Sequence, residues 1–427
     1  MPEISEMQLL IKNVRIVLPS SRWHGRQVDI FIENGTVTLI EPELDVPAEQ
    51  VFDAGGAFLS PGFVDVGTTV GDPGFEHRED FESVTEAAAA GGFTAIACLP
   101  NTNPAIHSKP EVKYVRNQAR NNLVDFLPIG AVSVDCAGKD IAELYDMRAA
   151  GAVAFSDGKK QIQSSALMLR ALLYVQPFDG VVLNQPLDAN MARGGQMHEG
   201  VTSTSMGLRG IPALAEELMV QRDIYLAEYS NSRLHLLNIS CKGSVELVRK
   251  AKAAGLKVTA SVPAMNLACT DSDLEEFDVN YKVMPPLRSE EDRQALKEGL
   301  LDGTIDFITS NHTPLDPEAK DLEFPFADFG AIGLETAFPL AAQSFPDADA
   351  EFFVEKLSLA PRRLLGLPVP ELEAGAPADF TIFSPSENWI LHADQIRSRS
   401  KNTPFTGQTL KGKVLGVVRR NKALLSR

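Results

Sequence analysis

The chain has 427 residues, of which 44% are hydrophobic and 23% charged, and this composition excludes disordered, collagen-like and small disulfide-rich proteins. The formal net charge is −17, so we expect no binding to the phosphate backbone of a nucleic acid. No apolar run approaches the roughly 20 residues needed to cross a membrane, and no signal-peptide pattern is visible. Four scattered cysteines without a CxxC pair are typical of reduced, buried thiols, so a cytoplasmic protein is expected.

The first and last segments of the chain are predicted to be β structure. Asn34-Gly35 stands between two apolar runs, which is a strong signal for a tight hairpin. Because chain termini often lie close together, we predict that residues 1–60 and 367–427 form one small β-sandwich domain. The strand-like runs are 9–11, 14–17, 29–32, 36–40, 378–383 and 413–418.

Between these ends, short apolar runs alternate with helix-like segments in a regular rhythm. Continuous apolar runs are typical of parallel strands that are covered on both faces. Eight such runs over about 300 residues predict an α/β fold, a (β/α)8 TIM-type barrel that spans residues 61–366. A doubly wound sheet is the alternative, but no Gly-x-Gly-x-x-Gly follows the first strands. The runs are 62–66, 93–98, 126–131, 152–155, 180–183, 234–237, 256–260 and 305–308.

Eight short segments form a combined pattern: Pro61–Asp65, Glu76–Phe81, Gly91–Thr94, Pro100–Thr102, Pro285–Arg288, Asp302–Asp306, Gly330–Thr336 and Asn402–Gly407. Together they resemble the dihydroorotases of the amidohydrolase superfamily, in particular the type found in multifunctional complexes, and their allantoinase and dihydropyrimidinase relatives. The resemblance covers nearly the whole chain. It implies a role in pyrimidine biosynthesis and a zinc centre that opens the cyclic amide of dihydroorotate or forms it from carbamoyl aspartate.

The same resemblance reveals departures at the ends of strands 1, 5 and 6, where a barrel carries its functional residues. The zinc-binding His-x-His pair of the family corresponds to Gly67 and Thr69. The arginine that holds the substrate carboxylate in the family corresponds to Gly71. The histidine ligands at strands 5 and 6 correspond to Asn184 and Asn238.

Strand 8 and the loops beside it depart from the family pattern as well. The catalytic aspartate of the family corresponds to Asn311, a substrate-contacting histidine to Leu315, and a family asparagine to Met284. Asp157 after strand 4 and Asn101 after strand 2 match the family. The resemblance implies substrate binding by Asn101, although Pro-Asn-Thr also forms a good Asx turn.

These departures remove each main contribution to the hydrolysis of the ring. Catalytic zinc takes at least three His, Asp, Glu or Cys ligands, and without it the pKa of water is not lowered toward neutrality. An amide such as Asn311 does not take up a proton at neutral pH. We therefore predict no zinc cofactor, no catalytic residue and an inactive barrel. The vestigial metal positions are Gly67, Thr69, Asp157, Asn184, Asn238 and Asn311.

Other polar residues near these positions are expected to be structural. His312 follows Asn311, while His77 and His198 lie in loops that the family shares. Asp157 is either a vestigial ligand or a residue that forms hydrogen bonds at a strand end. The asparagines at 184, 238 and 311 are expected to form one network of neutral hydrogen bonds, which costs less than an unpaired buried charge.

Lys159 and Lys160 follow strand 4. Some relatives carry a carboxylated lysine at that strand, where it bridges two metal ions. Because no histidine ligands surround this pair in the predicted barrel, we expect no metal there.

Three functions follow from this interpretation. The first is a non-catalytic dihydroorotase-like subunit, which the resemblance implies would assemble with aspartate transcarbamoylase and form a homo-oligomer. The second is an active dihydroorotase with an atypical metal site. The third is a structural protein that self-associates, as some hydantoinase-like relatives without metal sites do.

Overall fold

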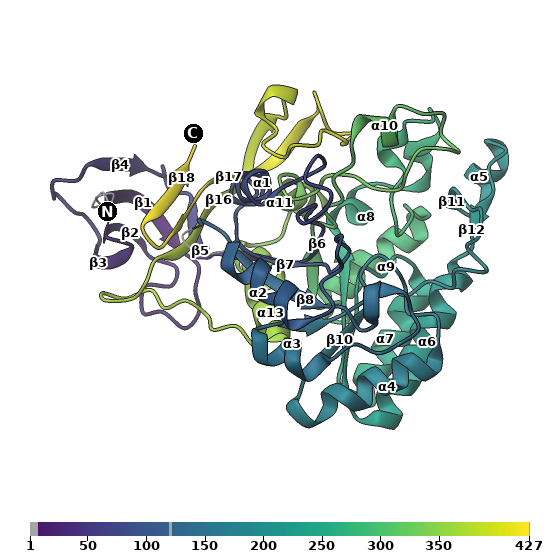
Figure 1. Ribbon diagram of the computed structural model, residues 1–427. Coiled ribbons are helices and arrows are strands. Elements are labelled where there is room, and N and C mark those ends of the chain that lie inside the picture. The colour runs from purple at the N-terminus through teal and green to yellow at the C-terminus, as the bar shows by residue number, and fades with distance from the viewer. Residues whose placement is uncertain (1–6, 119–121, 427) are drawn as a thin grey trace.

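The computed structural model describes residues 7–118 and 122–426 and contains a barrel with an additional β-rich domain beside it (Figure 1). All neighbouring barrel strands that form ladders are parallel. The predicted TIM-type barrel is therefore confirmed. Its strands, in sheet order, are β6 (Phe63–Thr68), β7 (Phe93–Cys98), β8 (Asp125–Gly130), β9 (Ala154–Phe155), β10 (Val181–Asn184), β13 (Arg233–Leu236), β14 (Val258–Pro263) and β15 (Phe307–Thr309).

A buried carboxylate connects the last barrel strand to the first. Asp65 of β6 accepts hydrogen bonds from the backbone N of Ser310 at 2.7 Å and from its Oγ at 2.6 Å. Just beyond, the backbone N of Thr69 donates to the carbonyl of His312 at 3.1 Å. These bonds bring the ends of β6 and β15 together, so the two most altered strand ends share one part of the barrel mouth.

Helices surround the barrel and bury their apolar faces against its strands (Figure 1). The first begins after Asp80, which forms a reciprocal capping box with Ser83. The helices are α1 (Phe81–Ala90), α2 (Lys109–Gln118), α3 (Leu144–Ala150), α4 (Ser165–Val175), α5 (Val201–Ser205), α6 (Ala213–Ser230), α7 (Lys242–Ala253), α8 (Ala264–Ala268), α9 (Glu290–Leu301), α10 (Pro317–Lys320), α11 (Ala337–Ser344), α12 (Ala350–Val354) and α13 (Ala360–Leu365). The short strands β11 (Met197–His198) and β12 (Gly210–Ile211) pair outside the barrel.

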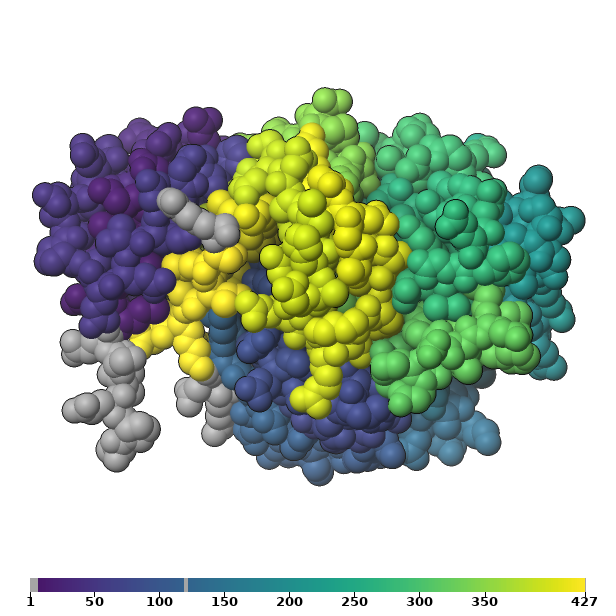
Figure 2. Space-filling view, turned by 90° about the horizontal axis from the view of Figure 1, so that it is seen from above, coloured from purple at the N-terminus to yellow at the C-terminus, as the bar shows by residue number. Residues whose placement is uncertain are grey.

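The β-rich domain joins the two ends of the chain, which lie side by side in Figures 1 and 2. The pairing of an N-terminal strand with a C-terminal one creates a single sheet, and Asn34 and Gly35 adopt the left-handed conformation of the predicted hairpin turn. The strands are β1 (Gln8–Ile16), β2 (Gln27–Glu33), β3 (Thr36–Glu41), β4 (Gln50–Asp53), β5 (Phe58–Pro61), β16 (Asp379–Ile390), β17 (Thr409–Arg419) and β18 (Lys422–Leu425).

Aromatic side chains connect this domain to the barrel. Phe383 of β16 lies 5.4 Å from Phe63 of β6 and 5.2 Å from Phe338 of α11, measured between ring centroids.

All four cysteines are free and buried. None of the helices in the described part of the chain is long and apolar enough to cross a membrane.

Candidate functional site

A pocket of about 560 Å³ opens at the carboxyl ends of the barrel strands, which is where barrels place their functional groups. Loops that follow β6, β7, β9, β10 and β15 surround it. The structure therefore brings together several positions at which the sequence departs from the family. The residues that line it include Thr69, Gly71, Asn101, Lys159, Met284 and Leu315.

The end of β6 and the loop after it are crowded at two glycines where the family carries larger side chains. A Cβ atom on Gly67 would lie 3.2 Å from Cδ2 of Leu237, and the φ angle of Gly67 is +94°. A Cβ atom on Gly71 would lie only 2.2 Å from the carbonyl oxygen of Phe75. A side chain at position 71 therefore requires the Phe75 backbone to move, whereas one at position 67 requires a small shift of the Leu237 side chain and a positive φ angle.

Asp157, the surviving carboxylate, turns toward the loop after β8. Its Oδ1 accepts a hydrogen bond from the backbone N of Ser133 at 2.8 Å, and its Oδ2 accepts one from the Ser133 hydroxyl at 2.5 Å. Burial raises the pKa of Asp157, although the bonds from Ser133 act in the opposite direction. Both oxygens therefore bind Ser133, one through its backbone and one through its hydroxyl.

Asn184 does not join the predicted asparagine network, and that part of the prediction is wrong. Its Nδ2 donates to Oδ2 of Asp223 at 2.7 Å, and its Oδ1 accepts from the backbone N of Ile162 at 3.2 Å. Asp223 belongs to α6 and is fully buried beside Arg222, at 2.6 Å. A buried carboxylate needs donors, and Asn184 supplies one.

The other two asparagines do contact each other. Nδ2 of Asn238 donates to Oδ1 of Asn311 at 3.1 Å, and Oδ1 of Asn238 accepts from the Thr309 hydroxyl at 2.6 Å. Nδ2 of Asn311 donates to the carbonyl of Met284 at 3.1 Å. These bonds occupy the amide that follows β13, where the family has a metal ligand, and the amide that follows β15, where the family has its catalytic base.

Lys159 occupies the centre of this arrangement. Its Nζ donates to Oδ1 of Asn311 at 2.6 Å, and its backbone N donates to Oδ1 of Asn101 at 2.7 Å. Burial lowers the pKa of the Lys159 ammonium to about 8, while Asp65 acts to raise it. The sequence predicts no metal at Lys159, but it does not predict a contact with Asn311. The position of Lys159 directly after β9 is the signal that it enters the barrel mouth.

A zinc centre does not fit these residues. The amides of Asn184, Asn238 and Asn311 are committed to protein partners, and an ammonium is bonded to the last of them. Over residues 7–118 and 122–426, no group of three or more His, Cys, Asp or Glu side chains is placed to hold a metal. We therefore derive no step through zinc.

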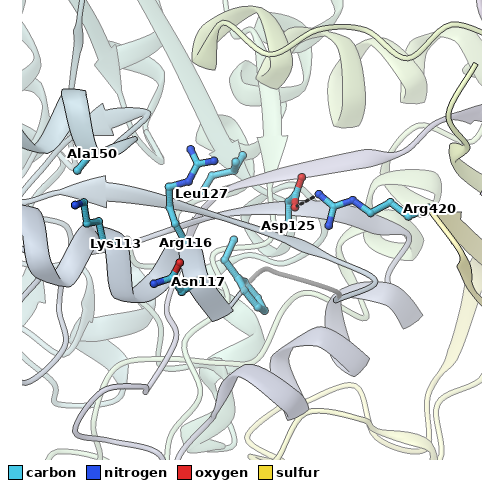
Figure 3. Close-up of a pocket in the computed structure, with 8 residues that line it drawn as sticks. Lys113, Arg116, Asn117, Asp125, Leu127, Ala150 and Arg420 are labelled. Atoms are coloured by element: carbon cyan, nitrogen blue, oxygen red, sulfur yellow. Dashed lines mark hydrogen bonds and ion pairs between the residues drawn. The ribbon is translucent and has the colours of Figure 1, made fainter. Parts of the chain in front are cut away.

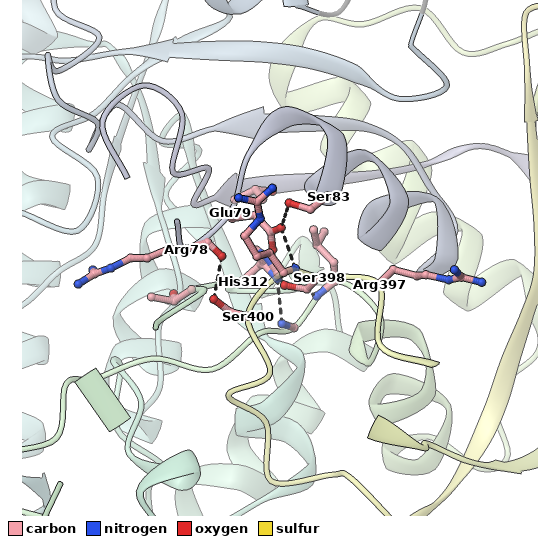
Figure 4. Close-up of polar contacts among 12 residues, drawn as sticks. Arg78, Glu79, Ser83, His312, Arg397, Ser398 and Ser400 are labelled. Atoms are coloured by element: carbon pink, nitrogen blue, oxygen red, sulfur yellow. Dashed lines mark hydrogen bonds and ion pairs between the residues drawn. The ribbon is translucent and has the colours of Figure 1, made fainter. Parts of the chain in front are cut away.

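His312 lies in a buried polar cluster beside the pocket (Figure 4). Its Nε2 is 3.3 Å from Oε2 of Glu79, and its Nδ1 accepts a hydrogen bond from the backbone N of Gly333 at 3.2 Å. Glu79 also accepts hydrogen bonds from the Ser83 and Ser398 hydroxyls. Burial alone would raise the pKa of Glu79, but His312 and the two hydroxyls together lower it. The cluster connects the loop before α1 to the loop after β15 and to the C-terminal segment that contains Ser398.

The remaining candidates have structural contacts too. Asn101 lines the pocket, but its Nδ2 donates to the carbonyl of Asp157 at 2.9 Å, so substrate binding by Asn101 stays a prediction. His77 is largely exposed, 3.9 Å from Asp316. Nδ1 of His198 is 3.2 Å from the Arg288 guanidinium, and Nζ of Lys160 reaches a loop carbonyl.

A second pocket of about 520 Å³ lies near the opposite, amino ends of the strands (Figure 3). Lys113 and Arg116 of α2 line it together with Asp125 at the start of β8. Asp125 is paired with Arg420 at 3.2 Å and also with Arg419. These pairs connect the barrel to the C-terminal strands. The described lining of this pocket includes none of the candidate residues at the carboxyl ends of the barrel strands.

Comparison with known proteins identifies the family. A family model described as dihydro-orotase-like matches residues 56–244. The chain is 42% identical to a dihydroorotase of Syntrophus aciditrophicus over 96% of this chain and 97% of that protein. It is also 42% identical to a dihydroorotase of Acetivibrio thermocellus, over 98% of this chain and 100% of that protein.

Solved structures agree on the architecture. The L-hydantoinase of Arthrobacter aurescens superimposes with a TM-score of 0.84 at 27% identity, over 98% of this chain and 96% of that one. A D-hydantoinase of Thermus sp. gives a TM-score of 0.81 at 21% identity and supports the fold alone. The 42% identity to two dihydroorotases over nearly the whole chain shows that the chain belongs to the dihydroorotase family of the amidohydrolase superfamily.

Proposed function

We propose that this member of the dihydroorotase family binds no zinc, has no dihydroorotase activity, and acts in the cytoplasm as a structural or regulatory subunit of pyrimidine biosynthesis. The observation that carries the proposal is the 2.6 Å hydrogen bond between Nζ of Lys159 and Oδ1 of Asn311. The bond joins an ammonium to Asn311, the neutral amide at the position that the resemblance assigns to the catalytic base of the family.

Electrostatics support this interpretation. A divalent ion about 4 Å from an ammonium is repelled by about 8 kcal/mol at an effective dielectric constant of about 20. In the family, carboxylates and imidazoles offset the charge of the metal. Here Asp157 is committed to Ser133, and Asn184 and Asn238 carry no charge. Without a metal-activated water and a general base, this pocket supplies no nucleophile that could open the cyclic amide of dihydroorotate.

The proposed subunit role includes self-association and a complex with aspartate transcarbamoylase, which the resemblance to inactive family members suggests. An exposed apolar surface is compatible with assembly. Leu214, Leu218, Tyr225 and Tyr229 of α6 follow helical spacing on one face, and both tyrosines are at least 70% exposed. Large exposed apolar patches often mark protein interaction sites.

The first experiment measures metal and activity on the same preparation. The chain is produced with added zinc and its metal content is determined. The interconversion of carbamoyl aspartate and dihydroorotate is then assayed in both directions. The 42% identical Syntrophus protein, named as a dihydroorotase, is prepared in parallel as the reference. We expect neither stoichiometric zinc nor turnover from this chain, and Asn311→Asp should remain inactive because it restores a base without a metal.

The second experiment tests the partner. The tagged full-length chain is recovered from native lysate and analysed by mass spectrometry and light scattering. Co-purification of a transcarbamoylase catalytic chain supports the complex, and its loss from a Tyr225→Lys, Tyr229→Lys variant with unchanged melting temperature would place the contact on α6. Recovery of a monomer without any transcarbamoylase contradicts the subunit role.

The alternative function is an active dihydroorotase with an atypical metal site. It is favoured by one observation, the near-complete alignment with proteins that are named as dihydroorotases. Stoichiometric zinc together with turnover in the first experiment would establish it.

A further inference from the structure

The pocket at the barrel mouth contains polar atoms that lack a protein partner. Gln185, which follows β10, is only 2% exposed, and its Oε1 is buried without a hydrogen bond to any described residue. Oγ1 of Thr69 is likewise buried and unbonded in the described structure. Buried polar atoms without partners cost free energy. A molecule in the pocket that supplies N–H or O–H donors would satisfy both atoms.

Lys159 lines the same pocket and needs hydrogen-bond acceptors, whereas Gln185 and Thr69 need donors. Its ammonium has three N–H donors, and among the described residues only Oδ1 of Asn311 accepts one of them. Arg78, the other cation of the lining, is paired with Asp316 at 2.6 Å. Lys159 is therefore the cation that remains available within the described lining, and a carboxylate is a suitable acceptor for it.

The walls and rim define the rest of the ligand. Phe75, Leu187, Met284, Leu315 and Phe329 contribute apolar surface to the pocket, which suits an aliphatic or aromatic body. The exposed carboxylate of Asp328 also lines it and disfavours a second negative charge on the ligand. A volume of about 560 Å³ lies within the usual range for small-molecule sites.

We propose that this pocket binds an apolar monocarboxylate that carries a hydroxyl or N–H donor at a distance from its acid group. The carboxylate is held by Lys159, the donor by Gln185 and Thr69, and the body by the apolar walls. This proposal deepens the proposed function, because it assigns a ligand to the metal-free site. The apolar walls distinguish this ligand from the polar cyclic diamide that dihydroorotases act on.

The probe is 3-(4-hydroxyphenyl)propanoate, titrated into the full-length chain by calorimetry and checked by ligand-observed NMR. Two matched compounds each remove one recognised group: the corresponding propanamide lacks the charge, and 3-phenylpropanoate lacks the hydroxyl donor. Since a hydrogen bond to a charged group is worth a factor of roughly ten or more, we expect the amide to bind at least about tenfold more weakly than the acid. 3-Phenylpropanoate should also be weaker than the hydroxylated acid.

Variants assign the effect to the pocket. Lys159→Met should abolish the preference for acid over amide, and Gln185→Leu should abolish the preference for the hydroxylated acid. Lys160→Met, at the exposed neighbouring position, should change neither. If Lys159→Met does not fold, the acid–amide comparison on the unmodified chain still decides.

Equal binding of acid and amide, no binding of either, or a preference for dihydroorotate over the probe would overturn the proposal. Zinc content and turnover are measured separately. Their presence would refute the proposed function without bearing on the acid preference of the zinc-depleted chain.

Discussion

Asp157 provides a sharp test of whether the surviving carboxylate is a ligand or a structural residue. Substitution by alanine removes both acceptors of Ser133, which is itself fully buried. A buried donor left without a partner costs about 1–3 kcal/mol. The lost backbone and hydroxyl bonds together therefore predict that Asp157→Ala lowers the free energy of unfolding by about 2–4 kcal/mol.

Asp157→Asn is the matched control, because an amide retains an acceptor for the Ser133 backbone N and leaves the hydroxyl free to reorient. We expect it to lose no more than about 1 kcal/mol. Urea unfolding of the three proteins, followed by circular dichroism, measures the difference, and the metal content should be unchanged in all of them. An alanine variant as stable as the native chain, but with altered zinc content, would refute this reasoning.

Three further predictions concern other parts of the site. Glu79→Ala should lower the free energy of unfolding by about 3–5 kcal/mol, measured by urea titration, because it leaves His312 and two hydroxyls buried without their acceptor. Burial lowers the pKa of Lys320 to about 8 from 10.5, so over that range the unfolded chain holds a proton that the folded chain has released. The native chain should therefore gain stability relative to Lys320→Met as the pH rises from about 8 to about 10, and urea titrations at both pH values test the sign. Gly71→Arg, which introduces the arginine of the family, should lower the melting temperature without promoting turnover, because its Cβ would collide with the Phe75 carbonyl; a stable variant would show that the loop can open.

The barrel could be predicted because its signal is local. Continuous apolar runs marked the parallel strands, and the Asn34-Gly35 pair marked a hairpin that the structure contains. The pairing of β16 with β5 depends on residues more than 300 positions apart. In this case the closeness of chain termini, rather than any motif, indicated it.

The candidate site was only partly predictable. The identity of the strand-end residues could be taken from the sequence, but their partners could not. Asn184 turns to Asp223 on α6, a residue without any motif around it, so the predicted asparagine network is smaller than expected. The role of Lys159 depends on a contact with Asn311 across the barrel mouth, which no local pattern encodes.

The glycines at the end of strand 1 show the same limit. The sequence indicated that a histidine and an arginine of the family are missing at Gly67 and Gly71. Only the structure shows that a Cβ atom at position 71 would collide with the Phe75 carbonyl, and that one at position 67 would press against the Leu237 side chain. An arginine at position 71 therefore requires the backbone at Phe75 to move, and not a substitution alone.

We propose that the barrel mouth carries an ammonium in place of a metal centre. The most direct measurement is the zinc content of the purified full-length chain after growth with zinc, combined with dihydroorotate formation on the same sample. If the proposal is correct, the sample contains no stoichiometric zinc and shows no turnover above a blank. Stoichiometric zinc, with turnover that is lost on chelation and restored by zinc, would contradict it.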